Sequence, residues 1–490
     1  METSEVTLEI GEKQRNSRRL SFSVFVGDIA KLSSGTLLAA VFSTLLVFLI
    51  PRVVSVEDFG YWRLFMLYAG YAGFLHLGFA DGALLCWAGR PFENFHGEIQ
   101  SSLKFMFWQH LAFIVPISLT LYLLSPRFRF LGIAVLCFAL VFNLACLLQY
   151  SLQGARLFKP VAIATALPVA TFAALVALRD LKSRPNYKEL IALYCVSWLF
   201  VLAYLWASAK FQERPVDVPS SPWGLGIKYT LLGWPILLAN GGFILAQSAD
   251  RLVVSSALPI HDFAQYSLAA SAMIVPVTAI AAIYKVFFSH IAAVEQHDRT
   301  KAYAHASRFV LIGWSLLLPY YFILEFFVRQ ILPNYVAGLA VAQVLLVGVI
   351  FLAGIQILHM SFAYLHGQQR KFLLCTIAAV VVIFSLVIVL ALQVRSLLAI
   401  AVGQVAAMAG WWLCDEWNLR KITGQNWKEW SRVWAVFGWS TLSYFGVAGW
   451  TGNVAARTLI YYTLVVGALY IACPNEVRLG WRLMGGVSTR

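Results

Sequence analysis

Apolar runs of about 20 residues recur along nearly the whole of this 490-residue chain. A helix of that length crosses about 30 Å of hydrocarbon, so each run is a candidate transmembrane helix. Only 12% of the residues are charged and 60% are hydrophobic, whereas soluble domains carry about 25% charged residues. The pattern excludes a soluble globular fold and predicts an all-α, polytopic membrane protein.

The connections between the runs are short, and segments predicted to face the cytoplasm hold about twice as many lysines and arginines as the outer ones. This bias places both termini in the cytoplasm, with residues 1–30 as a polar tail and the proline- and serine-rich segment 210–227 as a linker. The net charge of +14 follows from this topology and indicates no nucleic acid. Fourteen spans are predicted, at about 32–52, 62–86, 103–124, 130–150, 160–178, 189–209, 228–257, 264–288, 307–328, 339–361, 372–392, 396–415, 433–450 and 456–473.

The two halves of the chain resemble each other. Asp58-Phe59 matches Asp262-Phe263, Lys104-Phe105 matches Arg308-Phe309, and Leu152-Gln153-Gly154 matches Leu365-His366-Gly367. Each half contains six spans, an even number, so the repeat is parallel, about an axis along the membrane normal. We therefore predict two homologous six-helix bundles, 31–209 and 228–415, around a central cavity, followed by two extra transmembrane helices and a cytoplasmic tail in 416–490.

Four short segments carry a resemblance to a known family. They read KLSSGT at 31–36, SVEDFGYW at 55–62, LQGARLFK at 152–159 and SADRLVV at 248–254. In this order and spacing they resemble the oligosaccharide flippases of the MOP superfamily, the Wzx-type polysaccharide biosynthesis proteins. That family typically has twelve spans, and the related lipid II flippases carry two extra helices.

The resemblance implies an alternating-access flippase in the bacterial inner membrane, driven by a proton or sodium gradient and needing no cofactor. Its substrate would be an undecaprenyl-diphosphate-linked oligosaccharide, turned from the cytoplasmic to the periplasmic leaflet for assembly of O-antigen, capsule or exopolysaccharide. The implied partners are this substrate, membrane lipids, a polysaccharide polymerase and glycosyltransferases.

Two other functions compete with this one. An ion-coupled exporter of small amphiphiles, of the multidrug and toxin extrusion type, would share the fold, with an acidic cavity for cationic drugs instead of a basic one for diphosphates. A membrane polymerase or ligase would need a sizeable outer loop or an acidic motif. The chain has no DxD, GxSxG, HExxH or P-loop motif, so no enzyme is expected. Its seven cysteines form no CxxC pair or Cys/His cluster, which indicates neither a disulfide framework nor a metal site.

The seventh span holds the densest group of polar residues. Asn240, Gln247 and Arg251 are spaced i, i+7 and i+11 and therefore share one helical face, with Asp250 within a turn of Gln247. One interpretation is a substrate-binding stripe in which Arg251 binds a diphosphate or sugar hydroxyls. The other is a structural contact set of Asp250 and Arg251 with hydrogen bonds between helices.

The second span holds His76 and Asp81. Asp81 is the candidate ion-coupling residue, because a carboxylate in a low-dielectric site readily takes up a proton, although an ion pair with a neighbouring base explains it equally well. His76 is a candidate substrate ligand. Gly78 and Gly82 are spaced for close helix packing.

The remaining candidates are basic residues at span ends. Arg52 and Lys285 either meet the substrate or anchor their helices at the headgroups. Four residues of two inner loops either form an inner gate for the anionic headgroup or reflect topology alone: Arg156, Lys159, Arg370 and Lys371. Glu325 and His359 lie near predicted span ends, so we expect them at the membrane interface.

Overall fold

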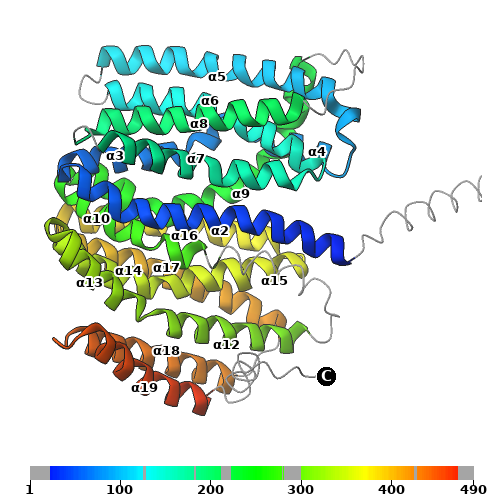
Figure 1. Cartoon of the computed structure of the whole chain (residues 1–490). Coiled ribbons are helices and arrows are strands. Elements are labelled where there is room, and N and C mark those ends of the chain that lie inside the picture. The colour runs from blue at the N-terminus through cyan, green and yellow to red at the C-terminus, as the bar shows by residue number, and fades with distance from the viewer. Residues whose placement is uncertain are drawn as a thin grey trace, which may run out of the picture. The chain divides into compact units, whose positions relative to one another are not determined.

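A computed structural model describes residues 22–124, 129–180, 184–210, 222–278, 280, 299–423 and 427–472 of the chain. All regular structure in these segments is helical (Figure 1). Eleven helices there are long and apolar enough to cross a membrane, and they coincide with eleven of the fourteen predicted spans. The predicted class, an all-α polytopic membrane protein, is therefore confirmed.

The other three predicted spans are built differently. Span 62–86 is interrupted, forming α3 (Val56–Ala69), a 3₁₀ turn (Ala72–His76) and α4 (Phe79–Trp87). Span 264–288 begins in α10 (Ile260–Ala272), and most of its second half lies outside the described residues. Span 433–450 lies within α18 (Trp427–Ala448).

Long helices make up most of the remaining structure, with π-helical and 3₁₀ segments between some of them. Their bounds are α2 (Phe22–Val53), α5 (His96–Leu124), α6 (Arg129–Gly154), α7 (Phe158–Asp180), α8 (Tyr187–Lys210), α9 (Pro222–Ala257), α12 (Arg299–Leu317), α13 (Tyr320–Ile331), α14 (Leu339–Ala353), the π segment η5 (Gly354–His359), α15 (Met360–Leu365), α16 (Gln369–Gln393), α17 (Leu397–Thr423) and α19 (Val454–Ala472).

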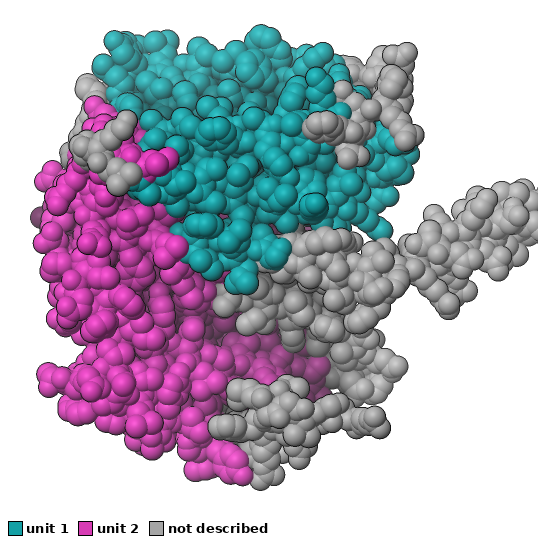
Figure 2. Space-filling view, viewed as in Figure 1, with its two compact units in different colours: residues 1–42, 75–177, 192–234 teal, residues 43–74, 178–191, 235–490 magenta. Residues whose placement is uncertain are grey.

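The chain divides into two compact units (Figure 2). Unit 1 contains residues 1–42, 75–177 and 192–234, and unit 2 contains 43–74, 178–191 and 235–490. Four of the boundaries fall inside α-helices, in α2, α7, α8 and α9, and the fifth falls inside the 3₁₀ turn Ala72–His76. The division into bundles 31–209 and 228–415 with an appended segment 416–490 stays a prediction.

The first pair of matched segments adopts the same local structure in both halves. A bend and one extended residue precede α3 at 54–55 and precede α10 at 258–259, at the spacing of the sequence match. The hydroxyl of Ser55 caps α3 by accepting from the backbone N–H of Asp58 at 3.0 Å, as the Ser-x-x-Asp pattern predicts. Phe59 and Phe263 are both buried.

The third pair, around Leu152 and Leu365, matches in a shifted register. After α6 the N–H of Leu157 bonds to Leu152 O, and after α15 the N–H of Gln368 bonds to Ala363 O, both at 2.8 Å. These are the six-residue closures of a Schellman motif, whose next-to-last residue is left-handed. That residue is Arg156 in the first half and Gly367 in the second, with φ of 61° and 67°.

The shift corrects the sequence alignment, which had paired Gly154 with Gly367. Gly154 is instead packed against Trp87, where an added Cβ would lie 3.1 Å from the Trp87 side chain. In the structural register Lys159 and Arg370 are equivalent, since each is the second residue of its helix.

Candidate functional site

The interruption of the second span is fixed by a glycine crossing within unit 1. Leu77 and Gly78 have φ of 52° and 83°, which ends the 3₁₀ turn and starts α4. An added Cβ on Gly82 would lie 1.9 Å from Tyr229 O, and one on Gly233 would lie 1.8 Å from Gly78 O. The two backbones of α4 and α9 therefore touch, and the predicted close packing through Gly78 and Gly82 is confirmed.

This crossing positions His76 and Asp81 beside each other. His76 is buried, and its Nδ1 accepts from the N–H of Gly78 at 3.0 Å, so the neutral ring carries its proton on Nε2. That Nε2 lies 3.9 Å from Asp81 Oδ2, too far for a hydrogen bond. Within the same unit, Asn143 contacts the ring of His110 at 2.8 Å. The cluster is polar, enclosed and only partly bonded.

A second carboxylate of unit 1 is fully engaged in structure. Glu98 Oε2 accepts from the hydroxyl of Tyr229 at 2.6 Å and from the indole N–H of Trp87 at 3.1 Å. Its Oε1 accepts from Arg90 at 3.0 Å. Glu98 was not predicted as a site residue. It lies between two predicted spans, four residues after Asn94, where acidic residues are common and carry no particular signal.

The polar residues of α9 are of two kinds: some are fully hydrogen-bonded within the protein, and others keep hydrogen-bond donors accessible to a ligand. Asp250 is buried and accepts from the hydroxyl of Tyr266 at 2.6 Å and from the N–H of Arg251 at 2.7 Å. Next to it Ser248 bonds to the hydroxyl of Tyr71. The contact set predicted around Asp250 is thus present, and it anchors α9 within unit 2.

Arg251 retains a more open position than its neighbour. Its guanidinium lies 3.9 Å from Asp250 Oδ1 and donates to Gln247 O at 3.3 Å, while 26% of the side chain remains exposed, against 4% for Asp250. Gln247 is half-buried and Asn240 is exposed. These three side chains leave donors accessible, whereas Asp250 does not.

The other predicted site residues are scattered. Lys285 lies outside the described residues. Arg52 is exposed in the last turn of α2. The four inner-gate candidates are all exposed at the two matched turns, and Lys371 alone of them lines a cavity. The roles assigned to all these residues stay predictions.

The structure brings together a buried group that the sequence analysis did not recognise. His359 and Glu416 are 0% and 4% exposed, and His359 Nε2 lies 3.0 Å from Glu416 Oε2. The same oxygen accepts from the hydroxyl of Tyr303 at 2.5 Å. Asp415, also buried, places Oδ2 3.8 Å from His359 Nδ1.

His359 is therefore buried inside the protein, and its depth in the membrane stays a prediction. The predicted twelfth span ended at residue 415, whereas α17 continues to Thr423, which carries Asp415 and Glu416 inside the helix and against His359. Trp417 and Leu419, which continue the apolar pattern past residue 415, were the available signal.

A second missed contact joins α19 to α13. Arg457 is 6% exposed, and its guanidinium lies 2.8 Å from Glu325 Oε2, while Arg329 binds the other oxygen at 2.9 Å. Glu325 was expected at the interface, but it holds the C-terminal helix pair in place. Tyr461 of α19 adds a hydrogen bond to Ser315 O at 2.8 Å.

Comparison with known proteins gives matches in structure only. No family model matches the chain, and no curated protein matches it in sequence. A solved structure of lipid II flippase MurJ in an inward closed conformation is 12% identical and has a TM-score of 0.70, covering 91% of this chain and 99% of that one.

Two structures of a multidrug resistance transporter of the MATE family, in the MOP superfamily, also match. The inward-facing one is 13% identical with a TM-score of 0.59, over 80% of this chain and 96% of that one. The outward-facing one is 14% identical with a TM-score of 0.53, over 81% and 95%. The matched proteins are transporters, and this chain has the fold of the MOP superfamily.

Proposed function

We propose that the chain is an alternating-access flippase that moves a lipid-diphosphate-linked oligosaccharide from the cytoplasmic to the periplasmic leaflet of a bacterial inner membrane. The fold likeness to the lipid II flippase carries the proposal, because its TM-score is 0.70, against 0.59 and 0.53 for the two drug transporters. That match also covers 91% of the chain instead of 80–81%. The extra part of the chain covered by that match is close in length to α18 and α19 together, which have 22 and 19 residues.

The α9 stripe supports an anionic, sugar-bearing substrate. A guanidinium presents a planar fork of N–H donors that matches a phosphate, and Arg251 is the partly exposed member of its cluster. The amides of Gln247 and Asn240 on the same face suit sugar hydroxyls. Asp250 is already bonded to Tyr266 and to the backbone, which leaves the guanidinium of Arg251 as the accessible charged group of this pair.

The driving force in this proposal is a proton or sodium gradient. Asp81 remains a candidate for coupling, since it lies unbonded beside His76 in an enclosed cluster. The exposed Lys159 and Arg370, equivalent at the two matched turns, are the pair most suited to a headgroup contact on the cytoplasmic side. The proposed partners are the glycosyltransferases that synthesise the substrate and a polymerase that consumes it.

The genetic test is deletion of the gene. We expect lipid-linked repeat units to accumulate on the cytoplasmic leaflet and a surface polysaccharide to disappear. Normal polysaccharide together with raised sensitivity to cationic drugs would favour the drug exporter instead.

The residue test compares three variants in the deletion strain. Arg251→Ala should abolish polysaccharide export, and Arg251→Lys should restore only part of it because an ammonium lacks the planar fork. Arg184→Ala, at an exposed arginine outside the stripe, is the matched control and should export normally. Wild-type export by Arg251→Ala at wild-type expression would remove Arg251 from the site.

A further inference from the structure

The buried group around His359 contains one contact in which neither polar atom is hydrogen-bonded. His359 Nδ1 and Asp415 Oδ2 face each other at 3.8 Å, and neither atom has a hydrogen-bond partner. Both side chains are more than nine-tenths buried. A buried polar atom without a partner is costly, so such pairs in native proteins call for an explanation.

Proton counting explains this contact. When the imidazole is neutral and its Nε2–H donates to Glu416, Nδ1 carries a lone pair aimed at a carboxylate oxygen. Two acceptors then face each other with two negative carboxylates nearby, which is expensive in a low-dielectric interior. One added proton, on Nδ1 or on Asp415, turns the same contact into a donor–acceptor pair and removes one unit of buried negative charge.

The charged and titratable groups around the triad come from three helices. Glu416, Asp415 and Cys414 belong to α17, Tyr303 belongs to α12 and donates to Glu416, and Lys371 with Cys375 belongs to α16. The tilted ring of Trp412 lies 5.4 Å from that of His359. The helix α14, which also packs on this segment, contributes no titratable side chain.

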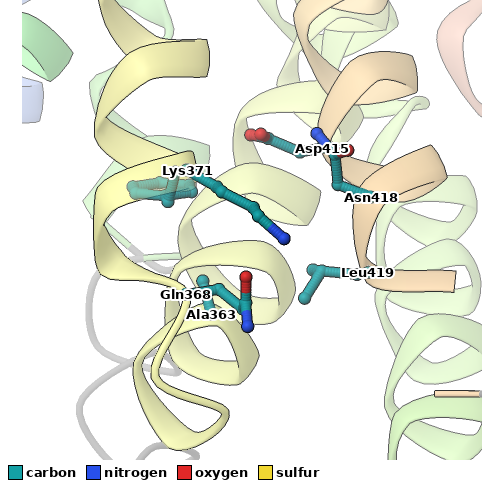
Figure 3. A pocket seen from close by; sticks show the side chains of 7 residues that line it. Ala363, Gln368, Lys371, Asp415, Asn418 and Leu419 are labelled. Carbon is teal, nitrogen blue, oxygen red and sulfur yellow. The ribbon is translucent and has the colours of Figure 1, made fainter. Parts of the chain in front are cut away.

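A small cavity leads from the surface to Asp415 (Figure 3). Its lining includes Gln368, Lys371, Asn418 and Asp415, and its interior of about 20 Å³ has room for one water molecule. In Figure 3 the Lys371 side chain reaches from α16 into the space below Asp415 and Asn418. The cavity begins at the turn between α15 and α16, an inner loop in the predicted topology, so a water there could pass protons between the cytoplasm and Asp415.

The backbone at His359 departs from a regular α-helix. Gly354–His359 is a π-helical segment, and such single-turn bulges occur frequently at functional sites. Its first residue allows close approach, since a Cβ on Gly354 would lie 2.2 Å from Trp412 Nε1. The His359–Asp415 contact therefore lies at the end of this π-helical segment.

We infer that His359, Asp415 and Glu416 form a proton-binding site that takes up one proton from the cytoplasmic side through the Asp415 cavity. Protonation joins α17 to the π segment, and deprotonation releases it. The inference is independent of the transported substrate and of Asp81.

The test uses the purified full-length chain in lipid nanodiscs, with no substrate. Infrared difference spectra between pH 9 and pH 6 report protonation of a buried carboxyl group or of the His359 imidazole, and an indicator dye counts the protons taken up. The wild type should take up about one proton per chain more than Asp415→Asn or His359→Gln, and these variants should lose the difference band that the added proton produces. Asp262→Asn, at an exposed carboxylate, should keep both signals.

Two outcomes would overturn the inference. One is an unchanged band and proton count in Asp415→Asn. The other is a band that responds at constant pH to replacing potassium chloride with sodium chloride, which would identify a sodium site. If His359→Gln does not fold, the near-isosteric Asp415→Asn decides the result alone. A failure here leaves the flippase proposal standing, because deletion phenotypes and Arg251 variants test that separately.

Discussion

The glycine crossing of α4 and α9 in unit 1 makes a quantitative prediction about Gly233→Ala. The added Cβ would lie 1.8 Å from Gly78 O and 2.5 Å from the backbone N of Gly82. Carbon atoms do not approach backbone atoms that closely, so the two helices must separate by more than about 1 Å. Overpacking of this kind costs about 1–3 kcal/mol, and the high end applies where backbone meets backbone and no side chain can turn away.

The matched control is Gly410→Ala in α17, where an added Cβ meets no atom within 4 Å. There the substitution should be neutral or stabilising by up to about 1 kcal/mol, because alanine is the better helix former. The two single-methyl changes should therefore differ by about 3 kcal/mol in free energy of unfolding.

Unfolding by sodium dodecyl sulfate in mixed micelles, followed by circular dichroism, measures this difference. Hydrogen exchange should locate the loss of protection of Gly233→Ala at residues 76–87 and in the first half of α9. Equal stability of the two variants would refute the backbone contact. A uniform loss of protection over the whole chain would refute its assignment to this crossing.

Three further predictions follow from the contacts. Glu98→Gln should destabilise unit 1 by about 2 kcal/mol in the same assay. Three donors bond to the Glu98 carboxylate, and hydrogen bonds to a charged acceptor are worth about 1.5–3 kcal/mol each. Wild-type stability of this variant would contradict these hydrogen bonds. Arg457→Ala should cost about 1–3 kcal/mol, because it removes the cation at Glu325 Oε2 while Arg329 still binds Oε1. Hydrogen exchange in α18 and α19 should increase, and the apolar pair Arg457→Met/Glu325→Leu should recover most of the loss; no recovery would show that the ion pair is not the cause. Reporter fusions after residues 185, 260 and 453 should all report the periplasm, and a cytoplasmic signal at 260 would refute both the topology and the parallel repeat.

Hydropathy alone located nearly all the membrane spans, because an apolar run long enough to cross a bilayer leaves few other structures open to it. The sequence match between Asp58 and Asp262 likewise falls on two turns of the same shape, because the acidic residue of the first helical turn and the buried phenylalanine after it recur together. The caps themselves differ, since Ser55 caps α3 with its hydroxyl whereas Pro259 gives α10 no side-chain cap. Turns of this kind depend on a few neighbouring residues, so a short segment of sequence is enough to predict them.

The positions that sequence reasoning misjudged depend on partners far along the chain. Hydropathy reports the length of an apolar run and not its breaks, so the left-handed residues Leu77 and Gly78 were not expected. His359 and Glu416 are 57 residues apart in sequence, and the sequence around either residue does not indicate that the other is its partner. The sequence alignment of the turns after α6 and α15 paired Gly154 with Gly367. The left-handed residue equivalent to Gly367 is Arg156 instead.

The most direct test of the proposed function is a flipping assay with the purified chain. Proteoliposomes would contain a fluorescent undecaprenyl-diphosphate-linked oligosaccharide, and a membrane-impermeant quencher or lectin would report its leaflet under an imposed proton or sodium gradient. The account predicts gradient-dependent translocation by the wild type, at least tenfold slower translocation by Arg251→Ala, and wild-type rates for Arg184→Ala. No translocation of this lipid by a folded wild type, together with gradient-driven export of a cationic amphiphile from the same vesicles, would contradict it.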